Sequence, residues 1–174
     1  MGKDKKLEHN IAIIMDENGS WAKKRGLRRI EGHREGDKNV KRIAEACIKY
    51  GVKYLTLYAF STENWKRPKR EVNVLMRLLS NFIREEKEEL LKDNIRILVS
   101  GEIEQLPGYL KKDIKNIIKE SAENERLIIN IALNYGARYE ILRAVKNIIK
   151  DVKNKKLKRA IEIYYKREIE DLVV

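Results

Sequence analysis

Four short apolar runs, separated by longer segments of helical periodicity, constrain the fold of this chain more than any other feature. The runs are residues 11–15, 54–60, 95–99 and 127–133. Each is nearly continuous rather than alternating, which is typical of parallel strands that are covered on both faces. Helical patterns occupy residues 36–50, 72–92, 108–124, 138–152 and 156–172. The alternation predicts an α/β fold, with a mostly parallel sheet flanked by helices.

The chain contains no linker, repeat or low-complexity segment in its 174 residues. We therefore expect residues 1–174 to form a single domain, which is long enough to bury a sizeable core. The single Cys47 permits no intrachain disulfide, and no apolar stretch reaches the roughly 18 residues of a membrane span. These features predict a cytoplasmic protein, which could still work at a membrane surface.

The formal net charge is +12, from 39 basic and 27 acidic residues. A basic excess suits an anionic substrate such as a diphosphate, an anionic lipid surface or a nucleic acid. No basic run is regularly interleaved with aromatic residues, so we do not expect a nucleic-acid partner. Lysine- and glutamate-rich solvation, as in heat-adapted proteins, also explains much of the charge.

Ligands of open α/β sheets bind beyond the carboxyl ends of the strands, so the residues that follow each apolar run are candidates. After the first run, Asp16 is placed to hold a divalent metal or to handle a proton. The turn that follows, residues 17–21, leads into a helix start, where backbone N–H groups favour an anion. The alternative is that this Asp-containing turn only caps the next helix.

Basic residues and a histidine follow this turn. Arginine binds phosphate with two parallel hydrogen bonds, so Arg28 or Arg29 is a better candidate than the neighbouring lysines. His33 stands in a Gly-His-Arg-Glu-Gly segment, which we predict to be a loop. Its glycines indicate a close backbone approach and favour a ligand or proton role over a capping role.

The segment after the second apolar run gathers polar and aromatic groups. Ser61, Asn64 and Arg67 together can bind diphosphate oxygens and polarise a leaving group. Trp65 has to pack or stack on another group, because exposure of an indole is costly. Glu71 either caps the following helix or pairs with Arg67.

Four segments carry a resemblance to a known family. Residues 9–22 follow the pattern H-x-A-x-I-M-D-G-N-x-R-W-A, and residues 32–36 follow G-H-x-x-G. Residues 58–72 match Y-A-F-S-x-E-N-W-x-R-P-x-x-E-V, and residues 133–138 are close to Leu-Asn-Tyr-Gly-Gly-Arg. The chain thus resembles the cis-prenyltransferases, the undecaprenyl (polyprenyl) diphosphate synthases.

The resemblance implies a Mg²⁺-dependent condensation of isopentenyl diphosphate onto an allylic diphosphate, which yields a polyprenyl diphosphate lipid carrier. It implies that Asp16 is the catalytic aspartate associated with Mg²⁺, and that Asn64 assists proton removal. The implied substrate-binding residues are Glu17, Asn18, Gly19, Ser20, Trp21, Arg29, His33, Ser61, Thr62, Glu63, Trp65 and Arg67. A homodimer, or pairing with a complementary chain, is implied as well.

The chain departs from the family pattern at three places. Glu17 replaces a glycine, and a non-glycine residue is strained there if the turn needs a positive φ. Ser20 replaces an arginine that would bind phosphate. The sequence ends at Val174 without the family's Arg-Thr-x-Gly-Glu segment, so we expect the C-terminal strands to be lacking. An alternative function is therefore a non-catalytic or partial subunit that binds diphosphate and pairs with a complete synthase.

The length of the product would depend on an apolar tunnel between the sheet and the predicted helix 72–92. Leu75, Met76, Leu79 and Phe82 are candidates for its wall. Helical spacing of this kind is equally typical of residues that only pack in the core.

Overall fold

The computed structural model describes residues 9–153, which divide after Tyr135 into two units. Each unit is described by itself. The single domain over residues 1–174 stays a prediction, and the helix expected at residues 156–172 lies outside the described residues.

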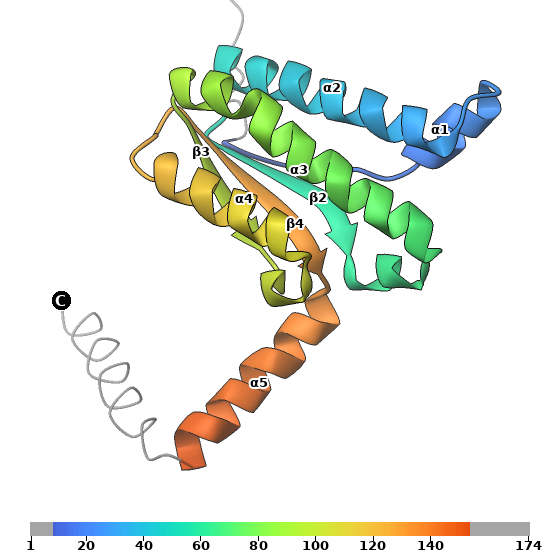
Figure 1. Ribbon diagram of the computed structural model, residues 1–174. Helices are drawn as coiled ribbons and strands as arrows, with labels where there is room; N and C mark the ends of the chain where they lie inside the picture. The colour runs from blue at the N-terminus through green and yellow to red at the C-terminus, as the bar shows by residue number, and fades with distance from the viewer. Residues whose placement is uncertain (1–8, 154–174) are drawn as a thin grey trace, which may run out of the picture. The chain divides into compact units, whose positions relative to one another are not determined.

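The first unit is built on a four-stranded, all-parallel sheet (Figure 1). Its strands are β1 (Asn10–Ile14), β2 (Tyr54–Ser61), β3 (Ile95–Ser100) and β4 (Leu127–Tyr135). They lie in the order β1-β2-β4-β3. All four predicted strands are confirmed, each to within two residues at either end, as is the predicted α/β class.

Helices connect the strands of this unit. They are α1 (Asn18–Lys24), α2 (Arg29–Lys49), α3 (Lys69–Lys92) and α4 (Gly108–Glu120), with short 3₁₀ turns η1 (Thr62–Lys66) and η2 (Ile103–Gln105). The second unit contains α5 (Ala137–Lys153), which confirms the helix predicted at residues 138–152. Among the described residues, no helix is both long and apolar enough to cross a membrane.

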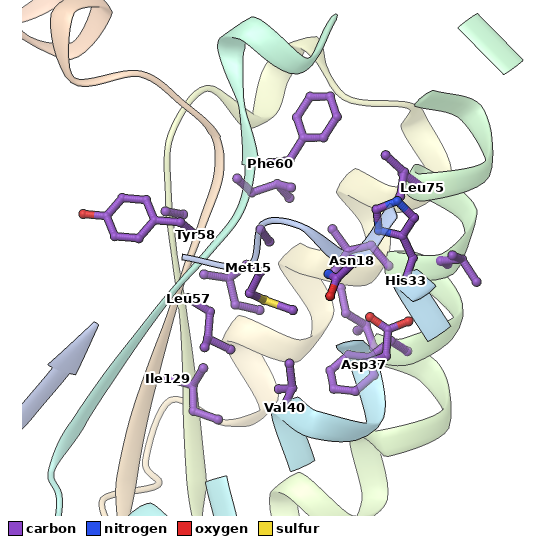
Figure 2. Close-up of a pocket in the computed structure, with 18 of the residues that line it drawn as sticks. Met15, Asn18, His33, Asp37, Val40, Leu57, Tyr58, Phe60, Leu75 and Ile129 are labelled. Atoms are coloured by element: carbon purple, nitrogen blue, oxygen red, sulfur yellow. The ribbon is translucent and has the colours of Figure 1, made fainter. Parts of the chain in front are cut away.

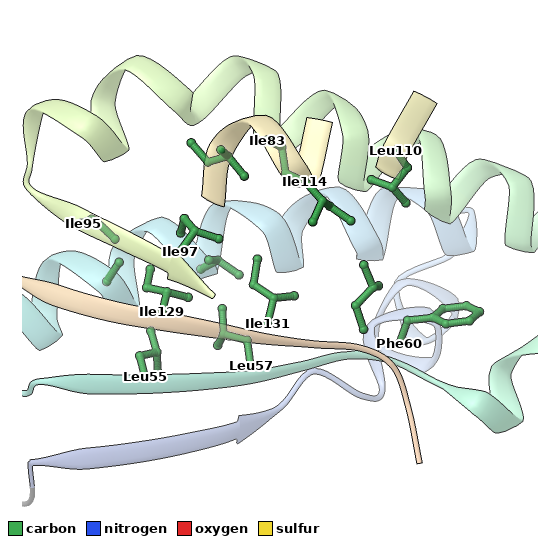
Figure 3. Packing of buried hydrophobic residues seen from close by; sticks show 14 of the residues in the cluster. Leu55, Leu57, Phe60, Ile83, Ile95, Ile97, Leu110, Ile114, Ile129 and Ile131 are labelled. Atoms are coloured by element: carbon green, nitrogen blue, oxygen red, sulfur yellow. The ribbon is translucent and has the colours of Figure 1, made fainter. Parts of the chain in front are cut away.

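The hydrophobic core of the first unit lies between α2, α3 and α4 and a single face of the sheet (Figure 3). Leu57 of β2 pairs with Ile131 of β4, and both side chains are buried on this face. On β2 the alternate residues Tyr54 and Tyr58 are 49% and 40% exposed. Residues 9–135 therefore do not provide the cover on both faces that the continuous apolar runs predicted.

The start of α2 differs from the prediction. We expected a helix from residue 36, but α2 begins at Arg29. The Glu31 carboxylate accepts a hydrogen bond of 2.7 Å from the backbone N–H of Arg28, which stabilises an earlier first turn. The loop predicted around His33 is therefore wrong, because His33 lies within a helix.

Candidate functional site

A cavity of about 470 Å³ extends from the carboxyl edge of β1 and β2 into the space between α2, α3 and the sheet (Figure 2). This volume is within the range of small-molecule sites. The predicted site residues that line it are Asp16, Glu17, Asn18, Gly19, Ser20, Arg29, His33, Ser61, Asn64 and Arg67. The other predicted site residues, Trp21, Thr62, Glu63 and Trp65, are not part of the lining.

The inner part of the cavity is mainly apolar. The four residues predicted as tunnel wall, Leu75, Met76, Leu79 and Phe82, all line it from α3. Leu57 and Ile129 line it from the sheet, and Val40 lines it from α2. Three of these α3 residues are partly buried and pack against the core, while Met76 is fully buried within it. The cavity thus has a polar mouth and an apolar interior, the shape expected for a ligand with a charged head and a hydrocarbon tail.

The turn between β1 and α1 forms one side of the polar mouth. The Asp16 carboxylate accepts a hydrogen bond of 2.9 Å from the N–H of Glu17. Glu17 has φ 64° and ψ 1°, in the left-handed region, and its side chain makes no cap hydrogen bond to α1. The strain expected for a residue that replaces glycine is therefore present in the structure.

This backbone strain leads to a stability prediction. Replacing Glu17 with glycine should raise the free energy of unfolding by about 0.5–1 kcal/mol, since relief of the left-handed strain exceeds the added chain entropy. Urea unfolding monitored by circular dichroism measures the change. Glu17→Ala is the matched control, because it removes the same charge and keeps the strain. An equal gain in both variants would attribute the effect to charge and contradict the backbone explanation.

Helix packing explains Gly32 and Gly36, the two glycines that we interpreted as a sign of close backbone approach. A Cβ atom on Gly32 would lie 1.9 Å from the carbonyl oxygen of Asn18, and one on Gly36 would lie 2.8 Å from the Asn18 side chain. The first turn of α1 therefore sits directly on α2. Similarly, a Cβ atom on Gly19 would lie 2.9 Å from the guanidinium of Arg29. These contacts fix Asn18 and Arg29 at the mouth of the cavity.

Two arginines converge at this mouth on one carboxylate. Glu71 Oε1 lies 3.3 Å from Arg29 Nη2 and 3.5 Å from Arg67 Nη1. These contacts are ion pairs, because among the described residues Glu71 Oε1 has no partner with hydrogen-bond geometry. Pairing of Glu71 with Arg67, one of the two alternatives for this residue, is confirmed. Glu71 holds two cations side by side and neutralises only one of them, which leaves a site suited to an anion.

His33 lies between these arginines and the interior. Its Nε2 atom is buried and has no hydrogen-bond partner in the described part of the chain. Burial, followed by the nearby charge of Arg67, lowers the pKa of His33, while Glu71 acts in the opposite direction. The imidazole is therefore neutral at neutral pH, and Nε2 can form a hydrogen bond with a ligand that enters the cavity.

The η1 segment is held in place by Asn134, which the sequence motif at residues 133–138 contains but which we did not predict as a site residue. Trp65 Nε1 donates a hydrogen bond of 2.7 Å to Asn134 Oδ1. The Asn134 amide donates in turn to the carbonyl of Glu102, at 2.8 Å, and to Gln105 Oε1, at 3.3 Å. Trp65 also packs edge-on against Phe60, with ring centroids 5.2 Å apart. Trp65 therefore packs and anchors its loop.

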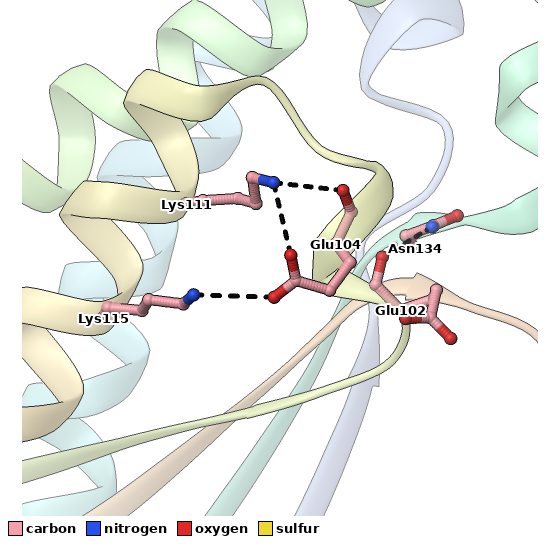
Figure 4. A network of polar contacts seen from close by, with 5 residues as sticks. All are labelled: Glu102, Glu104, Lys111, Lys115 and Asn134. Carbon is pink, nitrogen blue, oxygen red and sulfur yellow. Dashed lines mark hydrogen bonds and ion pairs between the residues drawn. The ribbon is translucent and has the colours of Figure 1, made fainter.

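The segment that receives the Asn134 hydrogen bond is fixed from the other side by α4 (Figure 4). Glu104 forms ion pairs with Lys111, at 3.3 Å, and with Lys115, at 3.5 Å.

Within the η1 segment, Asn64 Oδ1 accepts a hydrogen bond of 3.0 Å from the N–H of Ser61. This bond orients the Asn64 amide, and its NH₂ group can donate a hydrogen bond to a ligand.

Asp37 lines the cavity one helical turn beyond His33, a position that sequence reasoning missed. Burial, with a smaller contribution from Glu85, raises its pKa from the usual 3.8 to about 6. The side-chain carboxylate of Asp37 has no hydrogen-bond or ion-pair partner among residues 9–153. The sequence did contain a signal for this position. Asp37 stands four residues after His33 and three before Val40, a spacing that places all three on the same face of a helix.

The raised pKa gives a pH-dependent stability prediction. Between about pH 4 and pH 6 the folded state binds the Asp37 proton more tightly than the unfolded state, so stability falls as pH rises through this window. Asp37→Asn should therefore stabilise the protein by up to about 3 kcal/mol above pH 6 and have little effect near pH 4. Chemical unfolding of the wild type and the variant across this pH range measures the difference in their free energies of unfolding. A gain of equal size at both ends of the range would contradict the titration of Asp37.

Comparison with known proteins agrees with the resemblance found in the sequence. The family model for undecaprenyl diphosphate synthase matches residues 14–173. An isoprenyl transferase of Clostridium perfringens is 51% identical over 152 residues, which cover 87% of this chain and 60% of that relative. An isoprenyl transferase of Fusobacterium nucleatum is 49% identical over 150 residues, 86% of this chain and 65% of the relative.

A solved structure shows the same fold. Lavandulyl diphosphate synthase from Lavandula x intermedia, in complex with dimethylallyl diphosphate, matches with a TM-score of 0.82 and 34% identity. The match covers 85% of this chain and 64% of that one.

The parallel sheet and the cavity with its arginine-lined mouth define an α/β protein whose cavity is suited to an anionic, partly apolar ligand. The chain belongs to the undecaprenyl diphosphate synthase family. It spans about two thirds or less of the length of the relatives it matches.

Proposed function

We propose that this chain binds an allylic diphosphate in the cavity and takes part in its cis-condensation with isopentenyl diphosphate, giving a polyprenyl diphosphate carrier lipid. The observation that carries the proposal is the pair Arg29 and Arg67, held on Glu71 beside the unpartnered Nε2 of His33, at the mouth of an apolar cavity. The relatives that share this fold are named as isoprenyl transferases and as a prenyl diphosphate synthase.

The proposed binding mode follows from the polarity of the cavity. The diphosphate lies at the mouth, where the guanidinium groups of Arg29 and Arg67 donate paired hydrogen bonds and His33 Nε2 donates another. The prenyl tail lies along Leu75, Met76 and the other apolar residues of the interior, where its burial is favourable by about 25 cal/mol per Å². The same arginines stabilise the negative charge that develops on the leaving diphosphate.

The donor set at the mouth fits Mg²⁺ when a diphosphate is bound with it. The described residues contain no cluster of three or more acidic, histidine or cysteine side chains that could enclose a metal on their own. Mg²⁺, however, is commonly held by one or two carboxylates together with substrate phosphates, and Asp16 supplies one carboxylate at the cavity mouth. The bound ion would neutralise charge on the diphosphate.

In the proposed reaction, the bond between the allylic carbon and diphosphate breaks and a carbon–carbon bond to isopentenyl diphosphate forms. The proton that isopentenyl diphosphate loses passes to an oxygen of the released diphosphate. Asn64 is the residue that the family resemblance links to proton removal. Since its oxygen already accepts from Ser61, we propose that Asn64 contributes through its NH₂ group, which can donate to a diphosphate oxygen. Ser61, at the same edge of the cavity, contributes its hydroxyl.

The assembly and location of the protein belong to the same proposal. We expect a homodimer or pairing with a complementary chain, and work in the cytoplasm at or near a membrane surface, where a polyprenyl product would be used. The single Cys47, which is buried and free, is consistent with a reducing compartment.

A labelled-substrate assay tests the proposal. Purified chain is incubated with Mg²⁺, dimethylallyl diphosphate and labelled isopentenyl diphosphate, alone and together with a full-length relative. Elongation that depends on this chain supports the proposed function. Binding of the allylic diphosphate with no contribution to elongation would support the partial-subunit alternative. Absence of both binding and elongation would contradict the proposal.

A further inference from the structure

The carboxylate of Asp37 stands where the polar mouth of the cavity gives way to its apolar interior. On α2 the cavity is lined in turn by Arg29, His33, Asp37 and Val40. Asp37 lies about 6 Å beyond His33 along the helix axis, as four residues of α-helix require. Figure 2 shows Asp37 between His33 and Asn18 on one side and Val40 on the other.

The side chains around Asp37 do not compensate its charge. Leu57 and Ile129 of the sheet, and Met15 directly after β1, line this part of the cavity and are all apolar. The turn before α1 contributes further acids, Asp16 and Glu17.

The charges from the two helices do not compensate it either. From α3, Glu85 acts on Asp37 with a like charge, and Glu86 and Glu89 also lie on that helix. On α2 itself, His33 is neutral, and Lys41, one turn further on, forms ion pairs with Glu86 and Glu89.

An uncompensated acid in such a place destabilises the fold when it is ionised, and nothing in the packing of residues 9–153 uses it. It does, however, face the space that a prenyl tail occupies in the proposed function. A short tail whose diphosphate is held by Arg29 and Arg67 ends near His33. A tail of several isoprene units has to pass Asp37.

We propose that Asp37 is a specificity-determining residue, whose carboxylate disfavours long prenyl tails when ionised and admits them when protonated. This inference rests on the proposed function, because it takes the cavity interior to hold a prenyl tail. A long tail removes water from around Asp37, and the loss of water penalises the ionised form more than the neutral one. Binding of a long tail is therefore linked to proton uptake by Asp37, and binding of a short tail is not.

The experiment compares geranylgeranyl diphosphate with dimethylallyl diphosphate, by calorimetric titration of the full chain with Mg²⁺ at about pH 5 and about pH 8. The ratio of the two affinities cancels the titration of the diphosphate, which both compounds share. We expect this ratio to favour the long compound about tenfold more at the lower pH, as a further rise of about one unit in the Asp37 pKa on binding would produce. In Asp37→Asn the ratio should be independent of pH.

Glu35→Gln is the matched control, since it removes a charge from α2 two positions away and outside the cavity lining. It should retain the pH-dependent ratio of the wild type. A second measurement, titration at about pH 6.5 in two buffers of different ionisation enthalpy, should detect uptake of about half a proton with the long compound only.

The possible results distinguish a failure of the role of Asp37 from a failure of the proposed function. Binding of both compounds with a ratio that does not change with pH, or that changes equally in Asp37→Asn, would overturn the role of Asp37 and leave the proposed function intact. If Glu35→Gln abolished the pH dependence of the ratio just as Asp37→Asn does, the role of Asp37 would also be overturned. No saturable binding of either compound would overturn the proposed function and this inference together.

Discussion

Replacing Arg67 with alanine is expected to weaken the binding of dimethylallyl diphosphate by about 10- to 100-fold. A charge-assisted hydrogen bond to phosphate contributes about 1.5–3 kcal/mol, which corresponds to that range. Glu71 increases this loss of affinity. In the variant its carboxylate would pair with Arg29 only, and it would repel the diphosphate more strongly. Calorimetric titration at low ionic strength measures the change.

Two variants make this result specific. Arg67→Lys keeps the charge and removes the planar guanidinium, so it should recover only part of the affinity. Arg70→Ala removes the same charge from an exposed position outside the cavity lining and should change the affinity little. If Arg70→Ala were as damaging as Arg67→Ala, the effect would be a general one of net charge and the proposed contact would be wrong.

Replacing Asn134 with alanine is expected to lower the free energy of unfolding by about 3 kcal/mol. Asn134 is 1% exposed, and its amide joins Trp65 to Glu102 and Gln105. The substitution removes three part-buried hydrogen bonds, each of which contributes about 0.5–1.5 kcal/mol. Asn134 also has φ 51°, a left-handed conformation that alanine tolerates less well than asparagine. Denaturant unfolding measures the total.

A comparison of variants separates these two contributions. Asn134→Gly loses the hydrogen bonds but tolerates the backbone conformation, so it should be less destabilising than alanine. In a Trp65→Phe background, Asn134→Ala should cost less than in the wild type, because the indole N–H is no longer left without a partner. If the cost were the same in both backgrounds, the Trp65–Asn134 bond would not be what anchors the η1 segment.

Strands β2, β3 and β4 could be predicted from sequence because the first four residues of each bury alternate apolar side chains in the core. Leu55 and Leu57 point into it, while Tyr54 and Tyr58 are large enough to read as apolar although they are partly exposed. This is why the sequence also predicted cover on both faces. The start of α2 was missed because its signal is a single capping interaction of Glu31, which leaves no trace in hydrophobic periodicity.

The site was predicted where polar residues directly follow the apolar runs, as Asp16 and Ser61 do. Asp37 could not be predicted in the same way. Its importance depends on α3, which faces it across the cavity, and on the lack of a cation among residues 9–153 that compensates its charge. Asn134 was missed for a similar reason. Its partners Trp65 and Glu102 come from segments far away in sequence, and only the folded structure brings them together.

The proposed diphosphate and metal site is tested by the effect of Mg²⁺ on binding of dimethylallyl diphosphate to the wild type and to Asp16→Asn. The asparagine can still accept the hydrogen bond from the N–H of Glu17, so the turn should be preserved while the anionic metal ligand is lost. We predict that Mg²⁺ strengthens binding to the wild type by at least about tenfold and has little effect on the variant. Equal enhancement by Mg²⁺ in both proteins would contradict the assignment of the diphosphate and metal to this cavity mouth.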